Sequence, residues 1–154
     1  MGKNKSAKRS FFTALAIIVI IVALFITGCA RAQKSDIIEI KERMFISQIQ
    51  DIYLNTNDFM GKTIKLEGIF MESFWNESYY YYVIRYVPDP CCGTDSIGFM
   101  IKWPDGLREY PENNSWVETT GELKLFEDDF FRNLYIELTS LTVLETRGSE
   151  FVSR

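Results

Sequence analysis

The sequence contains no histidine among its 154 residues. Histidine is the usual general base for a serine or cysteine nucleophile, so its absence argues against a hydrolase built on a nucleophilic triad. The neighbouring acids Asp128 and Asp129 fall in an expected loop tip. No other spacing selects two carboxylates that would face each other across a glycosidase cleft. The sequence therefore predicts a protein that is not an enzyme.

Basic residues are few once the N-terminal segment is set aside. After residue 28 the chain has 13 basic and 21 acidic residues, a net charge of −8. Affinity for nucleic acid comes mainly from basic side chains on the phosphate backbone, so nucleic acid is excluded as an expected partner. The same charge argues against a broad electrostatic contact with anionic lipid headgroups. A sugar or a protein remains the better expectation for a ligand.

Cysteine is also scarce, and the first of the three, Cys29, ends an export signal. Four basic residues before position 10 precede sixteen uncharged, mostly apolar residues at 11–26, a run shorter than the roughly 20 residues that a spanning helix needs. Ile26-Thr27-Gly28-Cys29 then has the pattern of a bacterial lipobox, whose cysteine becomes the mature N-terminus and takes a diacylglycerol through a thioether. Two acyl chains anchor a protein stably.

We therefore expect residues 1–28 to be a lipoprotein signal peptide and Cys29 to be the lipidation site. The protein would be held by lipid on the extracytoplasmic face of a bacterial cell membrane. A plain transmembrane anchor is the alternative. Residues 29–36 are small and polar, and we expect them to form a tether. We expect residues 37–147 to form one domain and residues 148–154 to be an unanchored tail.

The hydrophobic pattern of residues 37–147 predicts a mainly β fold with one helix. Apolar residues three and four apart at 45–53 predict an amphipathic helix. Alternation predicts a short strand at 37–42 and then strands at about 61–71, 79–87, 97–103, 116–125 and 134–143. Gly68 and Gly121, inside strands, indicate bulges or sharp bends. We expect a small five-stranded OB-fold-like barrel whose N-terminal helix plugs the barrel end. A β-sandwich is the alternative.

A tyrosine-rich strand is one candidate for ligand contact. Alternation places Tyr80, Tyr82 and Tyr86 on one side together with Ile84. The opposite side carries Tyr79, Tyr81, Val83 and Arg85. Aromatic faces of this kind stack on ligands in small barrels, but tyrosine is also simply a good strand former.

The adjacent cysteines Cys91 and Cys92 are the other candidate site, and three interpretations stay open. A vicinal disulfide is strained, although an exported location permits oxidation. Zinc prefers four tetrahedral ligands, so without histidine Asp95, other carboxylates or a second copy would have to complete a metal site. One thiol could also simply be buried as a core residue.

Several short motifs give the chain a family resemblance. Residues 61–68, Arg85-Tyr86, residues 91–95, Gly98, Trp116-Val117 and Gly121 together resemble the soluble C-terminal domain of the YcgQ-like bacterial membrane proteins, over residues 37–147. The resemblance implies zinc handling or a transport-accessory role, with Cys91, Cys92 and Asp95 as candidate ligands. It also ties Arg85 to the pair and implies a membrane permease as a partner.

We therefore expect a surface-tethered, non-enzymatic binding or transport-accessory module that handles zinc through the double cysteine. One alternative is an extracytoplasmic thiol-redox protein. Another is an envelope interaction protein that binds through the aromatic strand, with Tyr80, Tyr82 and Tyr86 as contacts.

Overall fold

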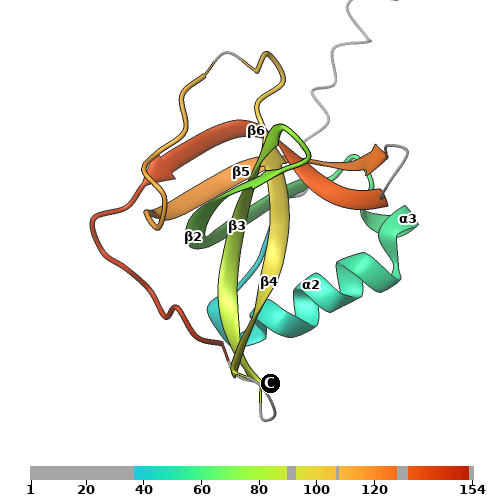
Figure 1. The fold of residues 1–154 in the computed structure, drawn as a ribbon. Helices are drawn as coiled ribbons and strands as arrows, with labels where there is room; N and C mark the ends of the chain where they lie inside the picture. Colours follow the sequence, from blue (N-terminus) through green and yellow to red (C-terminus); the bar gives the residue numbers. More distant parts are fainter. Residues whose placement is uncertain (1–36, 90–92, 107, 128–131, 153–154) are drawn as a thin grey trace, which may run out of the picture. The chain divides into compact units, whose positions relative to one another are not determined.

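The computed structural model describes residues 37–89, 93–106, 108–127 and 132–152. Figure 1 shows their arrangement. In chain order the elements are β1 (Ile37–Glu39), η1 (Glu42–Met44), α2 (Phe45–Leu54), α3 (Thr56–Phe59), β2 (Thr63–Trp75), β3 (Ser78–Asp89), β4 (Gly93–Lys102), β5 (Trp116–Glu127) and β6 (Arg132–Val143).

The strands form one sheet that closes on itself. Their order is β1-β2-β3-β4-β6-β5, and β2 also pairs with β5. The β4–β6 pairing is parallel, whereas the other pairings among β2 to β6 are antiparallel. Counting β2 to β6 as the five barrel strands, the ring runs first, second, third, fifth, fourth and back to the first, as in the OB-fold. The predicted OB-fold-like barrel is confirmed, and a sandwich of two separate sheets does not describe the chain.

Two glycines predicted to bend the strands lie where backbones approach too closely for a side chain. A Cβ at Gly68 would lie 2.6 Å from the carbonyl oxygen of Ile84. A Cβ at Gly121 would lie 2.2 Å from the carbonyl oxygen of Glu137, and the β5–β6 register shifts between Thr120 and Gly121. Long strands can therefore curve around a small barrel at these points.

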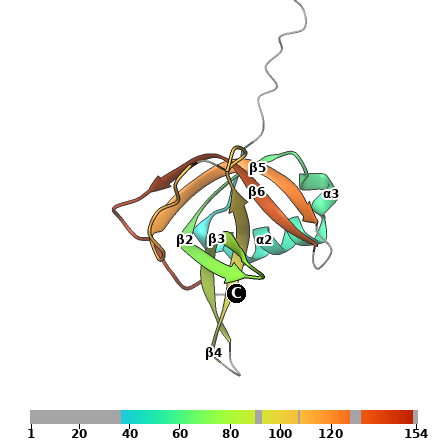
Figure 2. The ribbon, with the colours of Figure 1, turned by 45° about the horizontal axis from the view of Figure 1, so that its top comes forward.

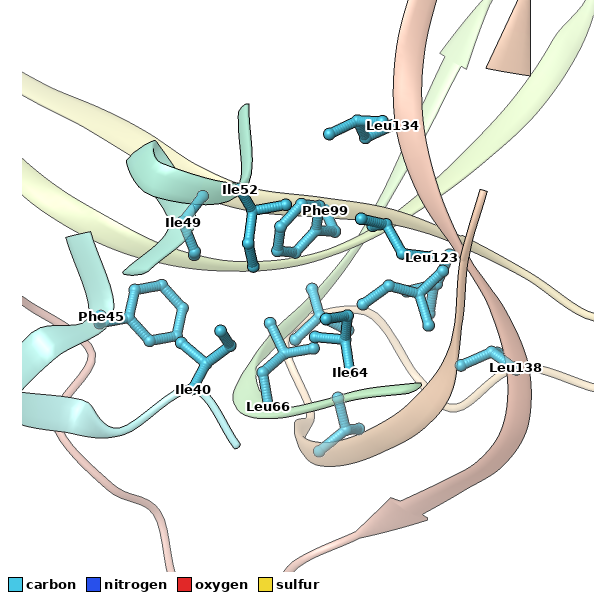
Figure 3. Close-up of a cluster of buried hydrophobic side chains, with 14 of the residues drawn as sticks. Ile40, Phe45, Ile49, Ile52, Ile64, Leu66, Phe99, Leu123, Leu134 and Leu138 are labelled. Atoms are coloured by element: carbon cyan, nitrogen blue, oxygen red, sulfur yellow. The ribbon is translucent and has the colours of Figure 1, made fainter. Parts of the chain in front are cut away.

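Helix α2 closes the core of the barrel, as predicted. Its buried residues Phe45, Ile46, Ile49 and Ile52 belong to the same hydrophobic cluster as the inward residues of the strands. Figure 3 shows Ile49 and Ile52 beside Phe99 of β4. Full burial of each such side chain contributes roughly 1.5–3 kcal/mol, so this apolar face is a core surface.

The strands around the candidate sites are longer than the sequence pattern indicates. Only Asn76 and Glu77 separate β2 from β3, with φ of +47° and +62°, as in a tight two-residue hairpin turn. Strand β4 begins at Gly93, paired with Asp89, rather than near residue 97. The resulting β3–β4 hairpin projects beyond the rest of the barrel in both ribbon views (Figures 1 and 2).

The C-terminal segment requires a correction. The sequence predicted an unanchored tail at residues 148–154, but its described part, residues 148–152, is attached to the barrel. The backbone N–H of Tyr86 donates to the Glu150 carbonyl, at 2.8 Å, and that of Val152 donates to the Tyr86 carbonyl, at 2.9 Å. The Val152 side chain is buried in the main core. Backbone hydrogen bonds of this kind leave no pattern in the sequence, and for this reason the polar composition was misleading.

Candidate functional site

The double-cysteine site predicted from the sequence cannot be placed. Cys91 and Cys92 lie outside the described residues, as does Cys29. Asp95 is described and exposed, and its Oδ1 accepts a hydrogen bond from the Ser96 N–H at 2.7 Å. Within the described ranges, no group of three cysteine, aspartate or glutamate side chains could hold a metal ion. Zinc binding by Cys91, Cys92 and Asp95 therefore stays a prediction.

Arg85 lies at the junction of three chain segments. Its side chain is 2% exposed, and its Nε donates to the Glu67 carbonyl at 3.0 Å. One terminal nitrogen, Nη1, donates to the Ser149 carbonyl at 3.2 Å and pairs with the Glu42 carboxylate at 3.2 Å. These contacts join β2, the turn before α2 and the C-terminal segment, so Arg85 has a structural role in holding the three segments together.

Two aromatic rings complete the surroundings of Arg85. The guanidinium carbon lies 4.8 Å from the ring centroid of Phe45 and 4.8 Å from that of Trp116. A planar cation between two rings gains cation–π stabilisation that increases on desolvation. This arrangement explains how a charged side chain is accommodated in the interior.

The predicted tyrosines separate into two groups. Tyr82 and Tyr86 pack against a small cluster on the outer side of the barrel, formed by Ile69, Ile84 and Trp116. Burial raises the pKa of Tyr82 above its usual value. These two tyrosines therefore serve packing in part, whereas Tyr80 lies nearer the β2–β3 turn and lines open hollows.

The larger of these hollows is a groove of about 530 Å³, a volume typical of small-ligand sites. We call it the aromatic groove. Strands β2 to β5 and the connection between β4 and β5 supply its lining: Glu72, Tyr79, Tyr80, Tyr81, Met100, Ile101, Lys102, Gly106, Arg108, Glu109, Tyr110, Pro111 and Phe126.

A stack of rings forms one wall of the aromatic groove. The rings of Tyr81 and Tyr110 lie 3.8 Å apart at an angle of 21°, and both also stack on Phe70. The Tyr110 hydroxyl accepts a hydrogen bond from the backbone N–H of Trp103 at 3.1 Å. Burial raises the pKa of Tyr110 above its usual value, and the Trp103 hydrogen bond opposes this shift. The β4–β5 connection is thereby fixed to the barrel, which preorganises the groove.

Charged side chains of both signs border these rings. Glu72 and Glu109 supply carboxylates, and Lys102 and Arg108 supply cations. The Arg108 guanidinium lies 4.5 Å from the Trp103 ring centroid and 3.7 Å from the Asp105 carboxylate. The lining thus combines flat apolar surfaces, hydroxyl groups and charged groups of both signs.

A second hollow, of about 360 Å³, adjoins the same strand. It is lined by Ser73, Phe74, Trp75, Tyr80, Tyr82 and Asn133, so Tyr80 belongs to both hollows. The Tyr80 ring centroid lies 6.4 Å from that of Trp75 and 6.5 Å from that of Phe126. Aromatic surface therefore continues from the groove to the tip of the β2–β3 hairpin.

Sequence reasoning identified Tyr80 but missed Tyr110 and Phe126. Tyr110 lies in a proline-rich connection, where no periodicity indicates the direction of a side chain. Its position next to Pro111, in a segment otherwise polar, was the available signal. The alternation placed Tyr81 on the same side of the strand as Val83, and in the structure Val83 is buried in the main core and Tyr81 packs against it.

The comparisons with known proteins establish a family. No curated protein matches the chain. Among solved structures, the dimeric N-terminal domain of PriB from Thermoanaerobacter tencongensis is similar at 18% identity, with a TM-score of 0.31 over 55% of this chain and 97% of that one. The family model described as the DUF1980 C-terminal domain matches residues 27–152. This match spans all the described residues, including the anchored C-terminal segment, so the chain belongs to the DUF1980 C-terminal domain family.

Proposed function

We propose that this protein is a non-enzymatic binding module that takes its ligand in the aromatic groove. The observation that carries the proposal is the wall formed by Tyr81 and Tyr110, which is fixed in place by the hydrogen bond to Trp103. A site of this kind needs little rearrangement to accept a ligand, and preorganisation reduces the entropic cost of binding. The lining offers stacking and hydrogen bonding, which are the elements of recognition.

The module acts on the outer face of a bacterial membrane, with Cys29 as its lipid anchor. The basic N-terminal residues, the apolar run at 11–26 and the Ile26–Cys29 motif support this part of the proposal. None of the helices in residues 37–152 that the structure describes is long and apolar enough to cross a membrane. A tether of residues 29–36 would keep the barrel close to envelope components.

Net charge narrows the class of ligand. The part of the chain after residue 28, with 13 basic and 21 acidic residues, repels phosphate backbones at long range. Envelope material that is not nucleic acid is therefore the expected source of the ligand.

A retention assay on washed bacterial envelope fragments tests this function. Residues 35–154 form a unit with its own core, so residues 30–154 can be used as a soluble protein. We expect the wild type to be retained and Tyr80→Ala to be lost to the supernatant. Phe151→Ala is the matched control, because Phe151 is an exposed aromatic residue beside Tyr86 and outside both hollows. Equal retention of the wild type and of Tyr80→Ala would refute the proposal.

Zinc handling at Cys91, Cys92 and Asp95, with a permease or another envelope protein as partner, is the second candidate. Two observations favour it. The Asp95 side chain is exposed on the β3–β4 hairpin. The last paired residues of this hairpin are Asp89 and Gly93, and Cys91 and Cys92 lie between them in the sequence.

A further inference from the structure

The two edges of the β3–β4 hairpin differ in how their backbone groups are satisfied. On the β3 edge, the N–H and the carbonyl of Tyr86 are both bonded to the C-terminal segment, at 2.8 and 2.9 Å. Outward-pointing residues alternate along a strand, so the next one on this edge is Pro88, which has no N–H. The β3 edge is therefore covered at Tyr86 and offers no donor at Pro88.

The outer edge of β4 has no such cover. Strand β4 pairs with β6 only over its last three residues, so among the described residues 93–99 have β3 on one side and no strand on the other. Because Tyr86 turns its backbone groups away from β4 and pairs with Ser96, the backbone groups of Ser96 point away from β3. The same alternation turns those of Thr94 and Gly98 outward.

Side chains occupy part of this edge. At the end near the barrel, the Gly98 carbonyl accepts a hydrogen bond from the Tyr53 hydroxyl at 3.3 Å, so helix α2 lies against the edge there. At the end near the hairpin tip, residues 94–96 are exposed. In this exposed part the Ser96 N–H donates to Oδ1 of Asp95 at 2.7 Å. The Asp95 carboxylate thus occupies a donor that a pairing strand would need.

An exposed strand edge is a template for pairing with another chain, and a charged side chain on the edge is one means of preventing it. We propose that Asp95 keeps the β4 edge closed to pairing with a second copy of this chain. The carboxylate does so in two ways: it binds the Ser96 N–H, and it places a negative charge beside the edge. This role is independent of the ligand in the aromatic groove.

A second copy is the excluded strand because the edge is complementary to itself. In an antiparallel arrangement with a two-fold axis at Ser96, Ser96 faces its own counterpart and Thr94 faces Gly98, so outward donors meet outward acceptors. The hairpin projects beyond the barrel in both ribbon views, which leaves room for two barrels (Figures 1 and 2). The two Asp95 residues would then be diagonal neighbours about 7–8 Å apart, where like charges repel.

Sedimentation velocity of residues 30–154 tests the proposal, with chelator and reducing agent present so that neither metal nor disulfides join the copies. We expect the wild type to be monomeric. Asp95→Ala frees the Ser96 N–H and removes the repulsion in both copies, so its dimer dissociation constant should be at least about tenfold lower than that of the wild type. Glu145→Ala is the matched control, because it removes the same charge from an exposed residue outside the hairpin, and it should stay monomeric.

A second substitution shows whether the dimer forms through this edge. Thr94 pairs with Pro88, and its N–H points away from β3, so Thr94→Pro removes an edge donor without breaking the β3–β4 ladder. The double variant Asp95→Ala, Thr94→Pro should therefore return to the monomer. Ser96→Pro removes the neighbouring outward donor and replaces Thr94→Pro if that variant does not fold.

The results that overturn the proposal are distinct. If Asp95→Ala is as monomeric as the wild type, or if the wild type is already a dimer, Asp95 does not keep the edge closed. Dimers of Glu145→Ala as stable as those of Asp95→Ala would show that only the net charge matters. Dimers of Asp95→Ala that persist with either proline would place the contact elsewhere on the molecule.

Discussion

Tyr110 stacks face to face on Tyr81, with ring centroids 3.8 Å apart, and so joins the β4–β5 connection to β3, the second barrel strand in sequence order. The two residues are 29 positions apart in the chain. Their contact turns an irregular connection into a rigid wall of the aromatic groove. The groove therefore depends on a loop that is held by one aromatic side chain and its hydroxyl group.

Substitutions at Tyr110 should separate these two contributions. Tyr110→Phe keeps the stack but leaves the backbone N–H of Trp103 without its acceptor, and we expect a loss of about 1 kcal/mol in the free energy of unfolding. Tyr110→Ala also removes the ring, and we expect a loss of roughly 2–3 kcal/mol. Urea unfolding measures both. Equal stability of the two variants would show that the ring contact contributes nothing.

Arg85 should prove essential to the fold. Arg85→Met fills similar volume but leaves the Glu67 and Ser149 carbonyls without a donor, so we expect a loss of roughly 3 kcal/mol or more. Arg85→Lys should not rescue stability, because an ammonium lacks the planar fork that reaches both carbonyls between two rings.

Glu42→Gln is the control for Arg85. The Glu42 side chain is 55% exposed, so its ion pair should contribute only about 0–1 kcal/mol. Denaturant midpoints should therefore fall far more for Arg85→Met than for Glu42→Gln. A midpoint for Arg85→Met close to that of wild type would mean that the three-segment junction is not needed.

Much of this fold follows from the sequence, and the exceptions have physical reasons. Alternation predicted a strand at about 61–71, and in that strand Ile64, Leu66 and Phe70 share one face, which lies in the core because a barrel strand has one buried face. The anchoring of Val152 and the stack of Tyr110 were not predictable in this way, since each depends on contacts made far along the chain. The hydrogen bonds of Arg85 to two backbone carbonyls are equally invisible to side-chain patterns.

Alkaline pH should weaken the docking of α2 on the barrel through Tyr53. Its single hydroxyl proton is shared between two acceptors, the Gly98 carbonyl and Asn133 Oδ1, both at 3.3 Å, and burial raises its pKa to about 12. The unfolded chain loses this proton near the ordinary value of 10.0, whereas the folded chain keeps it. The free energy of unfolding should therefore fall as pH rises from about 10 to about 12.

Tyr53→Phe has no proton to lose and should show a shallower decline over the same pH range. Because 42% of Tyr53 is exposed, solvent screening reduces the size of the difference between the two proteins. The prediction therefore concerns its direction, which is a steeper loss of stability for the wild type. Urea midpoints of the two proteins at matched pH values measure it. Parallel curves above pH 10 would contradict the assignment.

The double cysteine gives a prediction about metal. Native mass spectrometry of reduced residues 30–154, purified without chelator, should show bound zinc that is lost in the Cys91→Ser, Cys92→Ser double variant and weakened in Asp95→Asn. Thiolates and carboxylates are the only strong zinc ligands that a chain without histidine offers. Zinc binding unchanged in the double variant would end the metal hypothesis. A reversible loss of two protons' mass on oxidation would instead support the redox alternative.

The location of the ligand on the barrel is the central claim, and amide chemical-shift mapping of residues 30–154 tests it most directly. On addition of solubilised fragments of the bacterial envelope, the account predicts shifts at Tyr79, Tyr80, Tyr81, Tyr110 and Phe126, with Phe151 unchanged. Shifts confined to residues 93–98 of the β3–β4 hairpin, with the groove unaffected, would contradict it.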